Sequence, residues 1–214
     1  MIPVKSNTRF IFVRHGEVDN PKRIIYGQTV DVPLSPKGFL QMRQLASKLQ
    51  SKSIVPDIIY TSPLLRTLQS AKEILKIFPN TPVIEDDGLK DTYEPFLADK
   101  TLDWLKSIDG DEYDQPGVES PESIEIRMMK VIGKIVTKYE ERTIFIVSHG
   151  DPLAFLVWRL MYKEGDLPRI SELNNIGYLK KAEAWKVDLA PNLDVVENEI
   201  ISIDERLSKD EREY

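Results

Sequence analysis

The chain has 214 residues, of which 41% are hydrophobic and 30% are charged, and its formal net charge at pH 7 is −6. This composition is ordinary for a globular protein with a sizeable core, and the acidic balance argues against a general nucleic-acid binder, which needs a basic face. The absence of cysteine excludes disulfides, thiolate nucleophiles and cysteine-ligated metal.

No apolar run approaches the roughly 18 residues that a membrane span needs, and the first residues carry no apolar stretch of signal length. We therefore expect a cytoplasmic protein that does not bind membranes. No internal repeat or linker divides the chain, so a single domain over residues 1–214 is the simplest expectation. Residues 204–214 are highly charged and are expected to form a solvated tail.

The first half of the chain alternates apolar strands with amphipathic helices. A buried strand is predicted at residues 9–13. The helix expected at 36–51 has Ser35 as its N-cap and Pro36 in its first turn. A second strand is expected at 57–60, a helix opened by Ser62-Pro63 and running to Phe78, and a third strand at 82–84.

The second half begins with a polar stretch, residues 85–120, in which a short helix is expected around 100–108. Ser120 caps a long helix that continues to about Tyr139. A fourth strand follows at 143–147, then a helix from Pro152 to Tyr162, and a last strand or hairpin at 177–188. Such alternation predicts an α/β fold: a three-layer α/β/α sandwich with a mostly parallel central sheet.

The two histidines of the chain stand in matching positions. His15 follows the strand at 9–13 and His149 follows the strand at 143–147, and each is followed at once by glycine. Parallel α/β sheets build their sites at the carboxyl ends of strands. If these strands are neighbours in one sheet, the two histidines meet there.

Further polar residues follow the other predicted strands: Arg14 beside His15, Arg66 one turn into the helix opened by Ser62, and Asp91 in the loop after the third strand. Arginine pairs bidentately with phosphate oxygens, and a neutral imidazole nitrogen can attack phosphorus. A pocket that is positive overall and contains one acid suits a phosphate monoester.

Four blocks of sequence resemble, in order, the histidine phosphatase superfamily, also called the phosphoglycerate mutase-like family. They are VRHGE at 13–17, LSPKG at 34–38, YTSPLLRTLQSA at 60–71 and VSHG at 147–150. The resemblance covers roughly residues 9–160.

The resemblance implies a role for each matched residue. His15 is the expected nucleophile, which becomes phosphohistidine. Arg14, Arg66 and His149 are expected to bind the phosphate oxygens and to stabilise the transferring group. Asp91 stands where the family often has a glutamate as general acid, so it is the candidate proton donor and, later, the activator of water.

Two departures from the family concern the candidate site residues, and a third is the segment Tyr93-Glu94-Pro95-Phe96, which replaces the tryptophan-glutamate-glycine that often follows the acid. Aspartate is one methylene shorter than glutamate, which leaves Glu94, Glu17 and Asp19 as alternative acids. Asn20 is the candidate for the family's phosphate-binding asparagine, although it lies five residues after the histidine instead of the usual six, with Pro21 in the usual place.

The leading functional hypothesis is a metal-independent phosphomonoesterase that hydrolyses a small phosphorylated metabolite or nucleotide through phosphohistidine. Alternatives are a phosphoglycerate mutase and a non-catalytic phosphate-binding or sensing module. No cofactor is expected, and the two histidines lack the short spacing of metal motifs. The expected partner is the small phosphorylated substrate, with no nucleic-acid polymer and no membrane; the oligomeric state is not readable from the sequence.

Overall fold

The computed structural model describes residues 7–108, 110, 112–169, 172 and 178–203. The charged segment 204–214 therefore lies outside the described residues. The centre of the fold is a six-stranded sheet in the order β3-β2-β4-β1-β5-β6. The strands are β1 (Thr8–Arg14), β2 (Ile58–Thr61), β3 (Val83–Glu85), β4 (Thr143–Ser148), β5 (Ala184–Leu189) and β6 (Val195–Ile201).

The first four strands are parallel to one another, whereas β5 and β6 form an antiparallel hairpin added beside β1. The α-helices are α1 (Pro36–Ser51), α2 (Leu65–Leu75), α3 (Leu102–Leu105), α4 (Pro121–Lys138) and α5 (Gly150–Tyr162). Two short 3-10 helices, η1 (Asp87–Leu89) and η2 (Glu112–Asp114), lie in the polar stretch.

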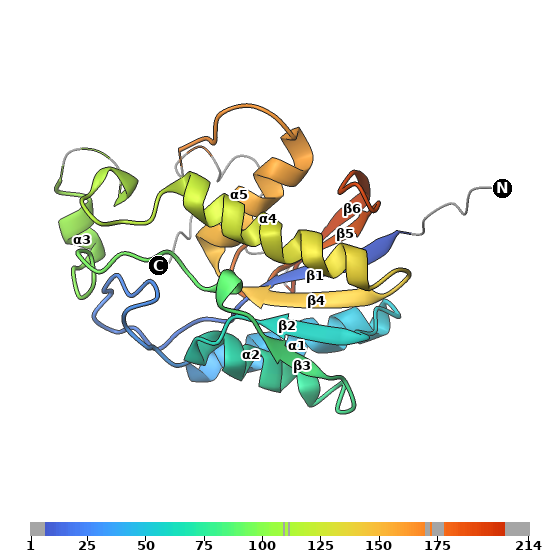
Figure 1. The fold of residues 1–214 in the computed structure, drawn as a ribbon. Helices are drawn as coiled ribbons and strands as arrows, with labels where there is room; N and C mark the ends of the chain where they lie inside the picture. The colour runs from blue at the N-terminus through green and yellow to red at the C-terminus, as the bar shows by residue number, and fades with distance from the viewer. Residues whose placement is uncertain (1–6, 109, 111, 170–171, 173–177, 204–214) are drawn as a thin grey trace.

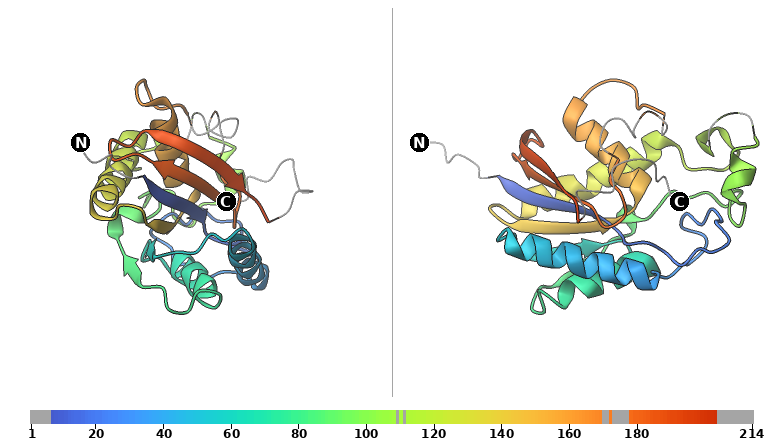
Figure 2. Two further views of the ribbon diagram at one scale, coloured as in Figure 1. Left: turned by 90° about the vertical axis from the view of Figure 1, so that its right-hand side faces the viewer. Right: turned by 180° about the vertical axis from the view of Figure 1, so that it is seen from behind.

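The sheet separates two apolar cores, which confirms the predicted three-layer sandwich. Phe10 and Phe12 of β1 point to the side covered by α4 and α5, and Ile11 and Val13 point to the side covered by α1 and α2. This alternation is the period of two expected of a strand buried on both faces. Figure 2 shows the same layers from two further directions, with the β5–β6 hairpin at one edge of the sheet.

Several boundaries differ from the sequence-based expectation. The helix after β2 ends at Leu75, short of Phe78, because the residue before Pro79 is disfavoured in helical conformation. The helix expected at 100–108 is a single turn. The final hairpin extends well beyond residue 188, and β6 escaped prediction because an edge strand with mostly exposed side chains carries no strong apolar pattern.

The predicted N-caps Ser35 and Ser120 are confirmed, whereas α2 begins at Leu65, after the expected Ser62-Pro63, and has no side-chain cap. The hydroxyl of Ser35 accepts a hydrogen bond from the backbone N–H of Gly38, and that of Ser120 accepts one from Ser123. Among the described parts of the chain, no helix is both long enough and apolar enough to cross a membrane.

The start of α1 packs backbone against backbone on the segment that follows β1. A Cβ atom placed on Gly38 would collide with the carbonyl oxygen of Glu17, and one placed on Gly16 would lie 2.5 Å from the carbonyl oxygen of Gly38. This close approach requires glycine on both sides, and it presses the chain directly after His15 against the end of α1.

We predict that Gly38→Ala destabilises the protein by about 1–3 kcal/mol, because the added methyl group overpacks a rigid backbone contact. Gly133→Ala is the matched control, since Gly133 lies inside α4 and a Cβ there would meet nothing within 4 Å. Replacing glycine by alanine at such a position stabilises a helix by about 0.5–1 kcal/mol. Urea denaturation followed by circular dichroism measures the free energy of unfolding of both variants. If the two substitutions change it with the same sign, the close backbone contact at Gly38 is not what decides the effect.

Candidate active site

The two histidines lie side by side because their strands are neighbours in the sheet. The parallel pairing of β1 with β4 sets Arg14 opposite Ser148, and the backbone N–H of His15 then donates to the carbonyl of Ser148 at 3.1 Å. The ring centroids of His15 and His149 are 5.3 Å apart. The arrowhead of β4 in Figure 1 marks this edge of the sheet. The expectation that the two strand-ending histidines meet is confirmed.

The hydrogen bonds of His15 identify its free nitrogen. Nδ1 lies 2.7 Å from the carbonyl oxygen of Gly16, which can only accept, so Nδ1 carries the proton and Nε2 keeps its lone pair. The side chain is almost completely buried, and burial, reinforced by the positive charge of Arg66 and the nearby His149, lowers its pKa well below 6.5. Lowering of the pKa favours the neutral imidazole of His15, in which Nε2 keeps its lone pair.

His149 has the opposite tautomer. Arg66 Nε lies 3.2 Å from its Nδ1, and since a guanidinium can only donate, Nδ1 accepts. Nε2 therefore carries the proton and donates to Ser62 Oγ at 2.9 Å. Ser62 reaches this place because β2 pairs with the other side of β4. Burial, together with the positive charges of Arg66 and Arg127, lowers the pKa of His149 well below 6.5.

Two arginines bring buried nitrogens with unused hydrogen-bonding capacity. Arg66 is 0% exposed; its Nη2 donates to Gly27 O at 2.5 Å and to Asp91 Oδ2 at 2.8 Å. Arg14 donates through Nη1 to Leu179 O. Within the described part of the chain, Arg66 Nη1 and Arg14 Nε are buried without a hydrogen-bond partner. Since buried donors are nearly always satisfied, these two nitrogens point to an anionic ligand.

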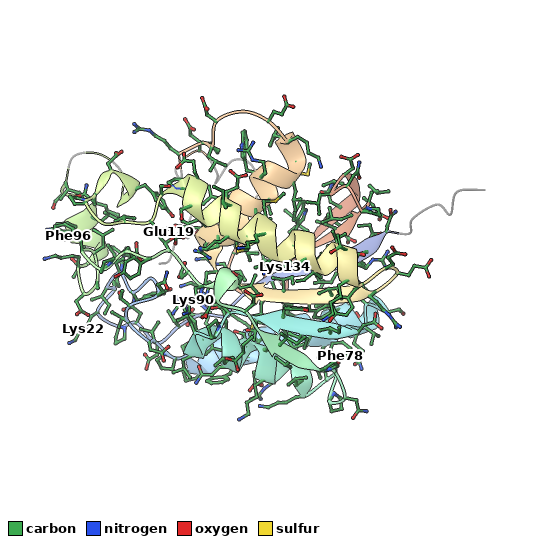
Figure 3. The ribbon with its side chains drawn as sticks, in the orientation of Figure 1. Lys22, Phe78, Lys90, Phe96, Glu119 and Lys134 are labelled. Carbon is green, nitrogen blue, oxygen red and sulfur yellow. The ribbon has the colours of Figure 1, made fainter. Side chains whose placement is uncertain are left out.

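Asp91 joins this group from the loop after β3. Besides its ion pair with Arg66, Oδ2 lies 3.5 Å from His149 Nδ1. Arg127 of α4 holds the loop by donating to the carbonyls of Gly88, Lys90 and Asp91, and it also pairs with Glu119. Figure 3 labels two residues of this region, Lys90 and Glu119. Arg127 escaped the sequence reading because nothing local distinguishes it from a solvated helix residue.

The other predicted residues divide into two groups. Glu94 lines the same pocket as His15 and is 9% exposed. Glu17 instead pairs with Lys37 at the start of α1, and Asp19 is exposed; neither lines this pocket.

Asn20 is not among the residues that line the pocket, and its phosphate contact stays a prediction. Its side chain donates to the carbonyl of Ile24 and accepts from the N–H of the same residue, at 2.8 and 3.1 Å. With both polar atoms of the amide engaged in this turn, Asn20 serves the loop that carries Tyr26 and Gly27 to Arg66.

The pocket also contains residues that sequence reasoning did not select. Beside Arg14, His15, Asp91 and Glu94, it is lined by Ile25, Tyr26, Gly27, Thr92, Gly150, Asp151 and Tyr178. One signal in the sequence was available for Asp151, which is that it comes two residues after His149, in the first turn of α5. Tyr178 comes from a segment with no motif; its ring lies 5.0 Å from the Arg14 guanidinium. Among the described residues, no cluster of three His, Asp or Glu side chains could hold a metal ion.

Comparison with known proteins agrees with this geometry. The family model of the histidine phosphatase superfamily (branch 1) matches residues 10–180. The chain belongs to the histidine phosphatase superfamily. The resemblance carried by the four sequence blocks is therefore confirmed.

Relatives within the superfamily include both phosphatases and mutases. The chain is 28% identical over 190 residues to "Uncharacterized phosphatase PhoE" of Bacillus subtilis (strain 168), covering 84% of this chain and 92% of the relative. It is 29% identical over 199 residues to "Probable phosphoglycerate mutase GpmB" of Enterobacter sp. (strain 638), covering 85% and 91%. The solved structure "Bacillus stearothermophilus YhfR" has the same fold, with a TM-score of 0.76 at 23% identity, covering 88% and 94%.

We predict that both histidines of the folded protein remain neutral at about pH 6, because lowered pKa values keep the uncharged forms dominant below the usual value of 6.5. Nitrogen–proton correlation spectra should show the Nδ1–H tautomer for His15 and the Nε2–H tautomer for His149. His15→Ala assigns the signals, and the chain in denaturant should titrate near 6.5 as a control. Imidazolium signals from the folded protein at pH 6 would contradict the assignment.

Proposed function

We propose that this chain is a metal-independent phosphomonoesterase that hydrolyses a small phosphorylated metabolite through a phosphohistidine intermediate. The observation that carries the proposal is the convergence of a neutral His15, whose Nε2 has a free lone pair, with two buried guanidinium groups that have unused donors. A nucleophile beside preorganised positive charge is what phosphoryl transfer needs.

In the first step, Nε2 of His15 attacks phosphorus while the bond from phosphorus to the leaving oxygen breaks. Arg14 Nε and Arg66 Nη1 donate to the phosphoryl oxygens. Arg66 can do this without releasing Asp91, because the ion pair uses Nη2. His149 accepts from Arg66 Nε through Nδ1 and donates to Ser62 Oγ through Nε2, so its part in this step is to hold the Arg66 guanidinium in position.

In the same step, Asp91, with a proton on Oδ1 while Oδ2 still accepts from Arg66 Nη2, gives this proton to the leaving alkoxide, and the alcohol departs. Asp91 then accepts a proton from water, whose oxygen attacks the phosphohistidine and releases inorganic phosphate and neutral His15. Glu94 and Asp151 also line the pocket. Of the alternative acids expected from the sequence, Glu94 lines the pocket and is the competitor for this role, whereas Glu17 and Asp19 do not line it.

The mutase relatives support a second candidate, in which the phosphoryl group returns to another hydroxyl of a phosphoglycerate. The two functions differ in the fate of the phosphohistidine. Water captures it in a phosphatase, whereas a bound alcohol captures it in a mutase. Transfer between the 2- and 3-positions of phosphoglycerate faster than phosphate release would establish the mutase.

We predict hydrolysis of para-nitrophenyl phosphate without added metal and with no loss on addition of EDTA. His15→Ala should reduce the rate to background, because the attacking nitrogen is gone, and it should also abolish acid-labile labelling of the protein by a phosphoryl donor. His15→Ala serves as its own control for contaminating phosphatases. Phosphate binding with no turnover in the wild-type protein would favour the sensing module instead.

The role of Asp91 is tested by leaving groups of different basicity. We expect Asp91→Asn to lower kcat on an alkyl phosphate by about 10²–10⁴-fold, because an alkoxide needs a proton, while para-nitrophenolate hardly does. Glu94→Gln is the matched variant, with the opposite expectation of no selective loss on the alkyl substrate. Equal losses on both substrates for Asp91→Asn, or a selective loss for Glu94→Gln, would remove Asp91 as the acid.

A further inference from the structure

One wall of the pocket is built around the carboxylate of Asp151. The hydroxyl of Tyr178 donates to Oδ1 at 2.6 Å, and the hydroxyl of Tyr113 donates to Oδ2 at 2.7 Å. Thr92 Oγ1 lies 3.2 Å from the Tyr113 hydroxyl. Because Tyr113 has already directed its proton to Asp151, Thr92 is the donor in that contact. Residues from three separate segments thus direct their hydroxyl protons toward a single carboxylate.

This arrangement decides what the wall offers to a ligand. Each hydroxyl carries one proton, and every one of these protons is committed to the chain that ends on Asp151. What remains on Asp151 are lone pairs of its carboxylate oxygens. Asp151 lines the same pocket as His15 and Arg14. A group that donates hydrogen bonds is satisfied by this wall, whereas a group that only accepts is not.

The phosphate group of an ester needs hydrogen-bond donors around it, whereas this wall of the pocket offers acceptors. Phosphate oxygens accept hydrogen bonds and are drawn to the unused donors of Arg14 and Arg66. The carboxylates of Asp151 and Glu94 repel phosphate, so they face the rest of the ester. The acceptor oxygens of Asp151 fit an alcohol that carries a further hydroxyl group.

We propose that Asp151 selects the leaving alcohol, so that the substrate is a phosphorylated polyol or sugar and phosphorylated hydroxy acids are rejected. This inference rests on the proposed phosphomonoesterase function. A carboxylate on the leaving group would meet like charge from Asp151 and would find no donor on this wall.

The electrostatics of Asp151 support this assignment. Burial and the negative charge of Asp91 raise its pKa, against the lowering effect of the two tyrosine hydroxyls and of Arg14. This side of the pocket already disfavours negative charge, and a further carboxylate brought by the substrate adds to the repulsion.

The test is a matched pair of substrates with the same three-carbon skeleton. Racemic glycerol 3-phosphate and racemic 3-phosphoglycerate differ only in the replacement of a CH2OH group by a carboxylate. For the wild-type protein we expect kcat/KM for glycerol 3-phosphate to exceed that for 3-phosphoglycerate by about tenfold or more. Asp151→Asn should reduce this ratio by at least about fivefold, because the amide removes the charge and supplies donors. The ratio cancels any general loss of rate in the variant.

Asp194→Asn, in the turn between β5 and β6, is the control and should leave the ratio unchanged. A wild-type preference for 3-phosphoglycerate, an unchanged ratio in Asp151→Asn, or a preference for phosphoethanolamine over glycerol 3-phosphate would overturn the polyol assignment. If Asp151→Asn does not fold, the wild-type ratio decides alone. Absence of para-nitrophenyl phosphate hydrolysis by the wild-type protein would instead remove the phosphomonoesterase proposal itself.

Discussion

The parallel pairing of β1 with β4 is the constraint on which the rest of the site depends. Its register sets Arg14 opposite Ser148, and therefore brings His15 and His149 together one residue beyond the ends of the strands. β2 completes the arrangement on the other side of β4 by delivering Ser62 to His149. A shift of one residue in either pairing would turn these side chains to the opposite face of the sheet. The apolar cores on both faces resist such a shift, because every inward residue would become misplaced.

Burial has a chemical consequence at this edge. Two guanidinium groups and two imidazole rings are buried together here. Two adjacent imidazolium ions would cost free energy in such surroundings. The histidines respond by remaining neutral, in the tautomers that Gly16 and Ser62 dictate. The arginines keep their charge, and each retains a buried donor for a ligand. The same desolvation that costs stability thus favours a neutral imidazole beside two guanidinium groups with unused donors.

The carboxyl groups are positioned by long-range contacts. Arg127 reaches from α4 to the carbonyls of the loop that carries Asp91, and Ser148 donates to Leu89 in the same loop. Asp151 is held between tyrosines from segments far away in the chain. Arg14, His15 and Arg66 come from a strand end and the start of α2, whereas Asp91 comes from a loop. This division is common in α/β proteins, in which a rigid sheet supports variable loops.

The sequence by itself determined the layers, the parallel core of the sheet and the group of His15, His149, Arg14 and Arg66. Each of these depends on local periodicity or on a short motif at a strand end. Only the tertiary structure decided that Asn20 closes a turn, that β6 forms an edge, and that Asp91 and Asp151 line one pocket. The physical reason is that a carboxylate or an amide takes its role from the donors around it. Those donors, such as Arg127, come from parts of the chain that no local pattern connects.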